Sequence, residues 1–211
     1  AVSQRQYGSL MSAKEAVQAA KLDKSVKFID ASWYMDKSRS GHKEFLLKRI
    51  QNAQFFDIDS VADKSTDLPH MLPNENEFAR AVEDMGISSS DHVVVYTHKD
   101  SFAGPRVWWT FRAFGHKKVS FLQGGLQAWE EEGQGPVVSG DLPTLPEKGH
   151  FQAKLDKKMV TDAKQVLDVI FSGSKQILDA RSVARFQGTA PEPRPNLAGG
   201  HIPGSLNLPF T

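Results

Sequence analysis

The hydrophobic positions of the first 135 residues alternate between strand-like and helix-like patterns. Residues 93–96 form a short run of β-branched and aromatic side chains, which is typical of a strand buried on both faces of a parallel sheet. A polar loop over 97–104 follows, and Pro105 favours the first position of a helix. Residues 119–122 form a second such run, and Gly124-Gly125 indicates a tight turn into another helix. The pattern predicts an α/β fold with a parallel sheet flanked by helices.

Two helices are marked by their own signals. Val107, Phe111 and Phe114 recur at i, i+4 and i+7, so they share one apolar face of the helix that begins at Pro105. Asn74 and Glu77 stand three residues apart before an apolar-periodic segment, which predicts a capping box at a helix N-terminus.

The chain contains a weak internal repeat at an offset of about 149 residues. Its three matched pairs of segments are 12–17 with 161–166, 29–32 with 178–181, and, after a short insertion, 49–53 with 201–205. Three matches in the same order and at similar spacing indicate a duplicated plan whose second copy is incomplete.

The repeat and the composition together predict the domain organisation. Residues 134–158 are rich in proline and glycine, as expected for a linker. We therefore expect a first domain over 1–133, a linker over 134–158, and the first part of a second domain over 159–211, which ends before the segment that matches residues 97–104.

Composition excludes several classes of function. Lys and Arg number 26 against 25 Asp and Glu, so no basic field favours nucleic acid as a partner. No apolar stretch approaches the roughly 18 residues of a membrane span, and we expect no membrane partner. The chain has no cysteine, which excludes disulfides, thiolate metal sites and a thiol nucleophile within these 211 residues.

Three arginines follow the predicted strand that ends at Asp179. Arg181, Arg185 and Arg194 carry planar guanidinium groups that can bind a carboxylate through two hydrogen bonds, which suits an α-keto acid. The alternative is that they pair with Glu192 or Asp179 at the surface.

A serine hydrolase site is a weaker hypothesis. His98, Asp100 and Ser101 are neighbours on one short loop, where they cannot easily form a line of nucleophile, base and orienting acid. The serine also lacks the G-x-S-x-G context.

Five motifs resemble the two-domain rhodanese-like sulfurtransferases, and in particular the mercaptopyruvate sulfurtransferases. They are DASWY (30–34), GPRVWW (104–109), GGLQAW (124–129), RFQGTAPEPR (185–194) and GHIPGSLNLPF (200–210). The resemblance implies tandem rhodanese-like domains, of which the second is catalytic and the first is not. The position where a catalytic domain would carry its cysteine is held by Thr97 in the first domain.

The resemblance also implies roles for individual residues. Arg185 and Arg194 match the arginines that hold the substrate in mercaptopyruvate sulfurtransferases, whereas thiosulfate-preferring rhodaneses usually carry an acid at the latter position. Asp59 and His70 match an Asp–His pair proposed to handle protons, although a lone histidine in a proline-rich loop is commonly a surface residue. His201 matches a family position as well, and we expect a structural role for it.

The implied function is sulfur transfer by the full-length protein. Sulfane sulfur would pass from 3-mercaptopyruvate, or from thiosulfate, through a cysteine persulfide to cyanide or to a thiol such as thioredoxin. The cysteine would lie beyond this chain, no metal or organic cofactor is expected, and the family occurs in the cytosol and in mitochondria. Two alternatives stay open: a cysteine-free rhodanese-like scaffold without catalysis, and a related cysteine-dependent phosphatase.

Overall fold

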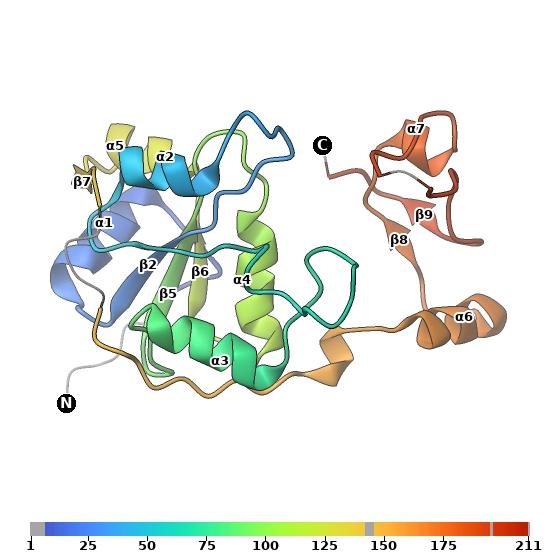
Figure 1. Cartoon of the computed structure of the whole chain (residues 1–211), viewed down its shortest axis with the longest axis horizontal. Coiled ribbons are helices and arrows are strands. Elements are labelled where there is room, and N and C mark those ends of the chain that lie inside the picture. The colour runs from blue at the N-terminus through green and yellow to red at the C-terminus, as the bar shows by residue number, and fades with distance from the viewer. Residues whose placement is uncertain (1–6, 142–145, 195, 211) are drawn as a thin grey trace. The chain divides into compact units, whose positions relative to one another are not determined.

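The chain divides into two compact units, residues 1–156 and residues 157–211 (Figure 1). The computed structural model describes residues 7–141, 146–194 and 196–210. The elements of the first unit are β1 (Leu10–Met11), α1 (Ala13–Leu22), β2 (Val26–Asp30), α2 (Gly41–Leu47), β3 (Arg49–Ile50), β4 (Gln54–Phe55), α3 (Glu75–Asp84), β5 (His92–Tyr96), α4 (Gly104–Ala113), β6 (Val119–Leu122), α5 (Gly125–Glu131) and β7 (Val137–Val138). Those of the second are the 3₁₀ turn η1 (Lys157–Met159), α6 (Ala163–Ser172), β8 (Leu178–Asp179), α7 (Val183–Phe186) and β9 (Leu206–Asn207).

The first unit is built on a five-stranded parallel sheet in the order β1-β6-β5-β2-β4. The central pair is the longest, with β2 and β5 in register from Val26 opposite His92 to Asp30 opposite Tyr96. Every residue of β5 is buried, which explains why its sequence is a continuous apolar run and not an alternating one. The predicted α/β fold is confirmed.

Helices cover both faces of this sheet (Figure 1). On one face α1, α2 and α5 pack against side chains such as Phe28 and Tyr96, and Trp129 is buried at the centre of this cluster. On the other face α3 and α4 pack their Phe78 and Phe111 against the sheet. The predicted apolar face of α4 is buried as expected.

Local signals explain where several helices begin and end. Asn74 accepts from the backbone N–H of Glu77 at 3.0 Å while the Glu77 carboxylate accepts from the N–H of Asn74 at 3.1 Å, so the predicted capping box is present. Helix α4 begins at Gly104, one residue before the predicted start at Pro105. A Cβ at Gly104 would lie 2.3 Å from the ring of Phe121, so only glycine lets the helix start this close to the sheet.

The carboxyl ends of β2 and β5 bring two loops together. In a parallel sheet the segments that follow neighbouring strands emerge at the same edge. Accordingly, the backbone N–H of Ala31 donates to the carbonyl of Tyr96 at 2.9 Å. This contact places residues 31–40 beside residues 97–103.

Most of the described part of the predicted linker packs on the first unit. Strand β7 pairs antiparallel with β3. Phe151 is buried among the rings of α3 and α4, and the N–H of Lys154 donates to the carbonyl of Phe114 at 3.0 Å. Composition alone did not reveal these contacts, because they depend on partners far away in the sequence.

The second unit repeats part of the plan of the first. In α6, Asp162 and Gln165 form a capping box like that of Ser12 and Glu15 in α1. Strand β8 then pairs parallel with β9, as β2 pairs with β4. Large apolar side chains of this unit are exposed, Phe171 by 86% and Phe210 by 65%.

Candidate functional site

Thr97 opens the loop that follows β5, at the position where the family resemblance led us to compare it with a catalytic cysteine. Thr97 is buried, and its carbonyl accepts from the N–H of Leu126 at 3.0 Å. Its hydroxyl lies 3.4 Å from the carbonyl of Ser101, to which it donates. The loop therefore closes on itself and on α5, without a thiol.

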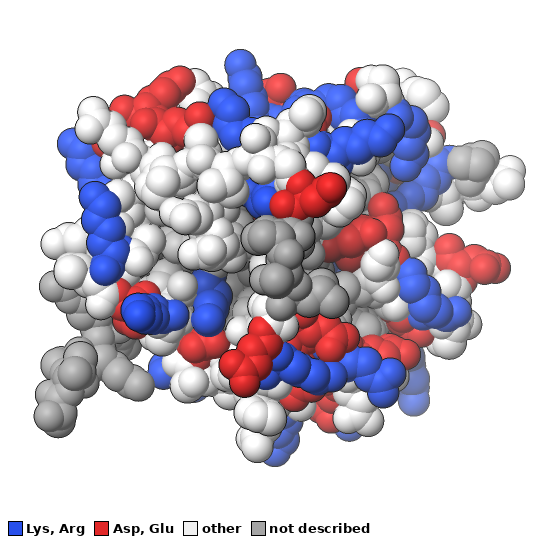
Figure 2. Space-filling view, turned by 60° about the vertical axis from the view of Figure 1, so that its left-hand side comes forward, with Lys and Arg blue, Asp and Glu red and all other residues white. Residues whose placement is uncertain are grey.

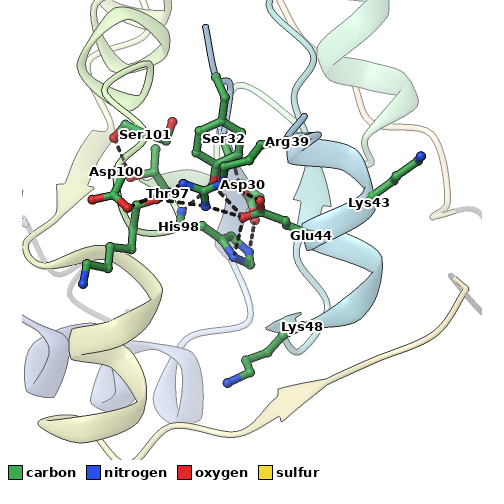
Figure 3. A network of polar contacts seen from close by, with 12 residues as sticks. Asp30, Ser32, Arg39, Lys43, Glu44, Lys48, Thr97, His98, Asp100 and Ser101 are labelled. Carbon is green, nitrogen blue, oxygen red and sulfur yellow. Dashed lines mark hydrogen bonds and ion pairs between the residues drawn. The ribbon is translucent and has the colours of Figure 1, made fainter. Parts of the chain in front are cut away.

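A buried carboxylate lies beneath this loop (Figure 3). Asp30, fully buried at the end of β2, accepts through Oδ1 from the Ser32 N–H at 2.9 Å and from the Ser32 hydroxyl at 2.5 Å. Its Oδ2 lies 3.1 Å from Nε2 of His98, an ion-pair distance without the alignment of a hydrogen bond. The backbone N–H of His98 donates to the Ser32 hydroxyl at 2.8 Å, which ties the two loops together.

A second layer of charges continues from His98 (Figure 3). Glu44 of α2 accepts from Nε and Nη2 of Arg39, both at 2.8 Å, and from the hydroxyl of Tyr34 at 2.7 Å. The Arg39 guanidinium lowers the pKa of Glu44, whereas burial raises the pKa of Tyr34. These groups satisfy one another, so the network stabilises the loop and offers no activated nucleophile.

The serine hydrolase hypothesis is wrong for the geometry of this loop. The Ser101 hydroxyl donates to the carbonyl of Trp33 at 3.1 Å, while His98 faces Asp30 and Asp100 lies 3.5 Å from Arg39. The three side chains therefore contact different partners instead of forming a catalytic line.

Asp59 and His70, predicted as a pair, lie together in the segment between β4 and α3. Oδ1 of Asp59 is 3.2 Å from Nδ1 of His70. The Asp59 side chain is 55% exposed and that of His70 is 20% exposed. His70 has a positive φ of 57°, and its carbonyl accepts from Nη2 of Arg106 at 2.6 Å. The structure therefore brings the two residues of the predicted pair together, with the carboxylate open to solvent and the imidazole mostly covered.

Sequence reasoning missed Trp33 at this pair. Its indole Nε1 donates to Oδ2 of Asp59 at 2.8 Å, and its ring meets the His70 ring edge-on with centroids 5.0 Å apart. The position of Trp33 just beyond a buried strand was the available signal, because side chains at the carboxyl ends of parallel strands commonly line sites.

In the second unit, Arg181 and Arg185 share one carboxylate. Arg181 donates from Nη1 to Glu192 at 2.8 Å, and Arg185 donates from Nη2 to the other oxygen of Glu192 at 2.5 Å. Glu192, only 5% exposed, thus holds the loop around α7 together. Arg181 also donates to Asp179, and these hydrogen bonds lower the pKa of Asp179 to about 2.

The remaining predicted residues lie on the same loop region. Arg194 follows Glu192 by two residues and is exposed. His201 has Nδ1 2.7 Å from the carbonyl of Phe186, and its ring stacks on that of Phe186 at 3.8 Å. The pairing with Glu192 that we considered as an alternative is present for Arg185, with its Nε and Nη2 engaged.

On the face drawn in Figure 2, basic and acidic side chains are interspersed. Among the described residues, none of the helices is long and apolar enough to cross a membrane.

Comparison with known proteins gives a consistent result. The profile of the rhodanese-like domain matches residues 12–132. The chain is 41% identical to the 3-mercaptopyruvate sulfurtransferase of Mus musculus, over 97% of this chain and 70% of that protein. It is 43% identical to the thiosulfate sulfurtransferase of Bos taurus, over 99% of this chain and 71% of that protein.

A solved structure is similar over most of the chain as well. A 3-mercaptopyruvate sulfotransferase from Escherichia coli, SseA, superposes with a TM-score of 0.84 at 34% identity, covering 96% of this chain and 75% of that one.

Proposed function

Because the chain belongs to the rhodanese-like family, we propose that the full-length protein is a sulfurtransferase that moves sulfane sulfur from 3-mercaptopyruvate to a thiol or cyanide acceptor. The chain corresponds to 70% of the mouse relative and contains no cysteine. The proposal therefore assigns the nucleophile to a cysteine of the full-length protein outside these 211 residues.

The two units fit a tandem arrangement of rhodanese-like domains. Each has a helix with an N-terminal capping box, then a strand, then a parallel partner strand. In the first, Thr97 follows the central strand β5 and the unit has no thiol, which suits a non-catalytic domain. The second carries the arginine-rich loop.

The donor assignment depends on two arginines in the segment after β8, Arg185 in α7 and Arg194 beyond it. Two guanidinium groups can hold the carboxylate and the carbonyl of an α-keto acid. Glu192 engages Nε and Nη2 of Arg185, which orients that guanidinium. Relatives that use mercaptopyruvate and relatives that use thiosulfate are about equally similar in sequence, so Arg194 is the feature that favours mercaptopyruvate.

The proposed reaction needs no metal or organic cofactor. The cysteine thiolate forms a bond to the sulfur of mercaptopyruvate, and the carbon–sulfur bond breaks. The electron pair of the broken carbon–sulfur bond goes to the methylene carbon, which gives the enolate of pyruvate. The two arginines stabilise the charge of this enolate. The proton of the donor thiol is transferred to that carbon, which leaves pyruvate and a cysteine persulfide anion. A thiol such as thioredoxin, or cyanide, then accepts the outer sulfur.

We assign the proton transfer to the Asp59–His70 pair. His70 can take the thiol proton and return it to the methylene carbon, and Asp59 stabilises the imidazolium that forms in between.

The test is sulfur transfer by the full-length protein from 3-mercaptopyruvate and from thiosulfate. We expect Arg185→Lys and Arg194→Lys each to lower kcat/KM for mercaptopyruvate by roughly 10- to 100-fold, since lysine keeps the charge but loses the two-pronged contact. The loss for thiosulfate, which has no carboxylate, is expected to be smaller.

Arg80→Lys, an exposed change on α3, is the matched control and should leave both reactions unchanged. Equal losses for the two donors would contradict the keto-acid assignment. A full-length protein that transfers sulfur from neither donor would favour the scaffold alternative.

A further inference from the structure

One hydroxyl of the loop that follows β5 binds both backbone polar groups of Trp33, which lies in the segment after β2. Ser101 donates to the carbonyl of Trp33 at 3.1 Å and accepts from the N–H of Trp33 at 3.0 Å. Both backbone polar groups of Trp33 are thus bound by one side chain 68 residues away in the sequence. This double contact sets the position of the Trp33 backbone.

The side chain of Trp33 then contacts both members of the Asp59–His70 pair. Each carboxylate oxygen of Asp59 has its own partner, the indole N–H on Oδ2 and Nδ1 of His70 near Oδ1. The indole ring also packs edge-on against the imidazole at an interplanar angle of 86°. Trp33 therefore restricts the rotation of the carboxylate and of the imidazole together.

Such support is needed because the ion pair is weakly held by itself. Asp59 is more than half exposed, and exposed ion pairs contribute little to fixing a geometry. The indole N–H of Trp33 adds a directional hydrogen bond of 2.8 Å to the same carboxylate. Ser101 therefore holds the backbone of Trp33, and the side chain of Trp33 holds the carboxylate of Asp59.

We propose that Trp33 and Ser101 position the Asp59–His70 pair, so that the loop without a nucleophile in the first unit supports proton transfer. This inference rests on the proposed function for its catalytic content. Trp33 and Ser101 are positioning residues, since they act through Asp59 and His70.

The test measures sulfur transfer from 3-mercaptopyruvate by full-length Trp33→Phe, which removes the indole N–H and keeps an aromatic ring. We expect kcat to fall about tenfold with little change in KM, as for a misplaced catalytic group. Ser101→Ala should lower kcat in the same direction by a smaller factor. Trp33→Phe combined with Asp59→Asn should have the same kcat as Asp59→Asn alone, because both changes break the same contact between Trp33 and Asp59.

Trp108→Phe is the matched control. It also removes an indole N–H that is hydrogen-bonded, in this case to the carbonyl of Val119. We expect it to leave kcat unchanged. An equal fall in kcat for Trp108→Phe and Trp33→Phe would overturn the inference, as would full activity of Trp33→Phe.

A second readout does not depend on activity. It is the NMR spectrum, in which each tryptophan gives an indole N–H resonance; these 211 residues contain four tryptophans. The resonance that disappears in Trp33→Phe belongs to Trp33. We expect this resonance to move in Asp59→Asn and in Ser101→Ala, and not in Trp108→Phe. If it stays in place in Asp59→Asn, the positioning contact is refuted even in an active enzyme. If it moves but the unmodified protein transfers no sulfur, the proposed function fails, and with it the catalytic role of the positioning.

Discussion

The surroundings of individual ionisable side chains in this protein favour different charge states. His92, at the start of β5, is buried with Nε2 2.9 Å from the hydroxyl of Ser120 and the ring of Tyr7 against its own ring. Burial lowers the pKa of His92 to about 4, with the nearby His116 acting in the same direction. Asp179, by contrast, is held as a carboxylate by Arg181. A neutral buried histidine makes folding sensitive to acid.

We therefore expect the stability of the protein to fall between pH 6.5 and pH 4 in part because of His92. The unfolded chain binds a proton near pH 6.5 that the folded chain accepts only near pH 4. Stability from this residue is complete above pH 6.5 and is lost as the pH falls through that window, on the order of 1 kcal/mol per pH unit at most. His92→Gln should flatten the pH dependence of the urea midpoint between pH 7 and pH 5, whereas His150→Gln, at an exposed position, should not. Parallel curves for His92→Gln and the unmodified protein would contradict this account.

At the residue scale, the family motifs indicated which side chains to compare in the structure. Asp59 and His70 were expected as a pair from the family resemblance, and they lie 3.2 Å apart, while their role in proton transfer stays a prediction. Their support by Trp33 was not foreseen, since Trp33 and Asp59 are 26 residues apart and no periodic pattern links them. The sharing of Glu192 by Arg181 and Arg185 was foreseen only as one alternative, because sequence does not show which of two nearby acids an arginine will bind.

Among the elements, the turn before α5 shows how glycine determines a close approach. Gly124 and Gly125 have positive φ values of 72° and 59°. A Cβ at Gly125 would lie 2.3 Å from the carbonyl of Thr97, which accepts from the N–H of Leu126. The turn therefore presses α5 against the loop that follows β5, and it holds that loop in place.

Gly125→Ala should destabilise the protein by roughly 2–4 kcal/mol, since it adds a steric clash with backbone to an unfavourable backbone conformation. Gly140→Ala is the control, because Gly140 also has a positive φ of 87° but no atom within 4 Å of the added Cβ. Its expected cost is only about 1–2 kcal/mol. Urea unfolding of both variants measures the difference, and equal costs would mean that the close approach to Thr97 is unimportant.

Most helices and long strands of the first unit were predictable from periodicity and caps. The strands at 93–96 and 119–122 and the capping box at Asn74 agree with the structure to within a residue or two. The early start of α4 was missed because it depends on the space between Gly104 and Phe121, which neither residue reveals by itself. The two-residue strands β3 and β7 were also missed, since they pair Arg49 with Val138 and Ile50 with Val137, far apart in the sequence, without a hydrophobic pattern of their own.

At the scale of the whole molecule, the two units differ in how completely their sheets are covered. In the first, β5 lies between two strands with helices on both faces and is fully buried. In the second, β8 has β9 as its partner, and Leu178 and Leu206 are each more than half exposed. The internal repeat predicted the shared order of helix and strands, but not the packing of residues 146–156 onto the first unit.

Amide hydrogen exchange of the 211-residue chain should reflect this difference. We expect the amides of β2 and β5 to exchange slowest, and those of β8 and β9 to exchange at least about a hundredfold faster, since protection grows with burial and with hydrogen bonds on both sides. Mass spectrometry of peptic fragments can compare the two units in one experiment. Equal protection of β5 and β8 would show that the second unit is as stable as the first.

The absence of cysteine, with Thr97 directly after β5, has a practical consequence for labelling. All sulfur in these 211 residues belongs to five methionines, so iodoacetamide at neutral pH has no thiol to modify here. Every carbamidomethylated cysteine or trapped persulfide found on the full-length protein must map to another stretch of its sequence. Peptide mapping of the full-length protein can therefore locate the sulfur-carrying residue without background from this part of the polypeptide.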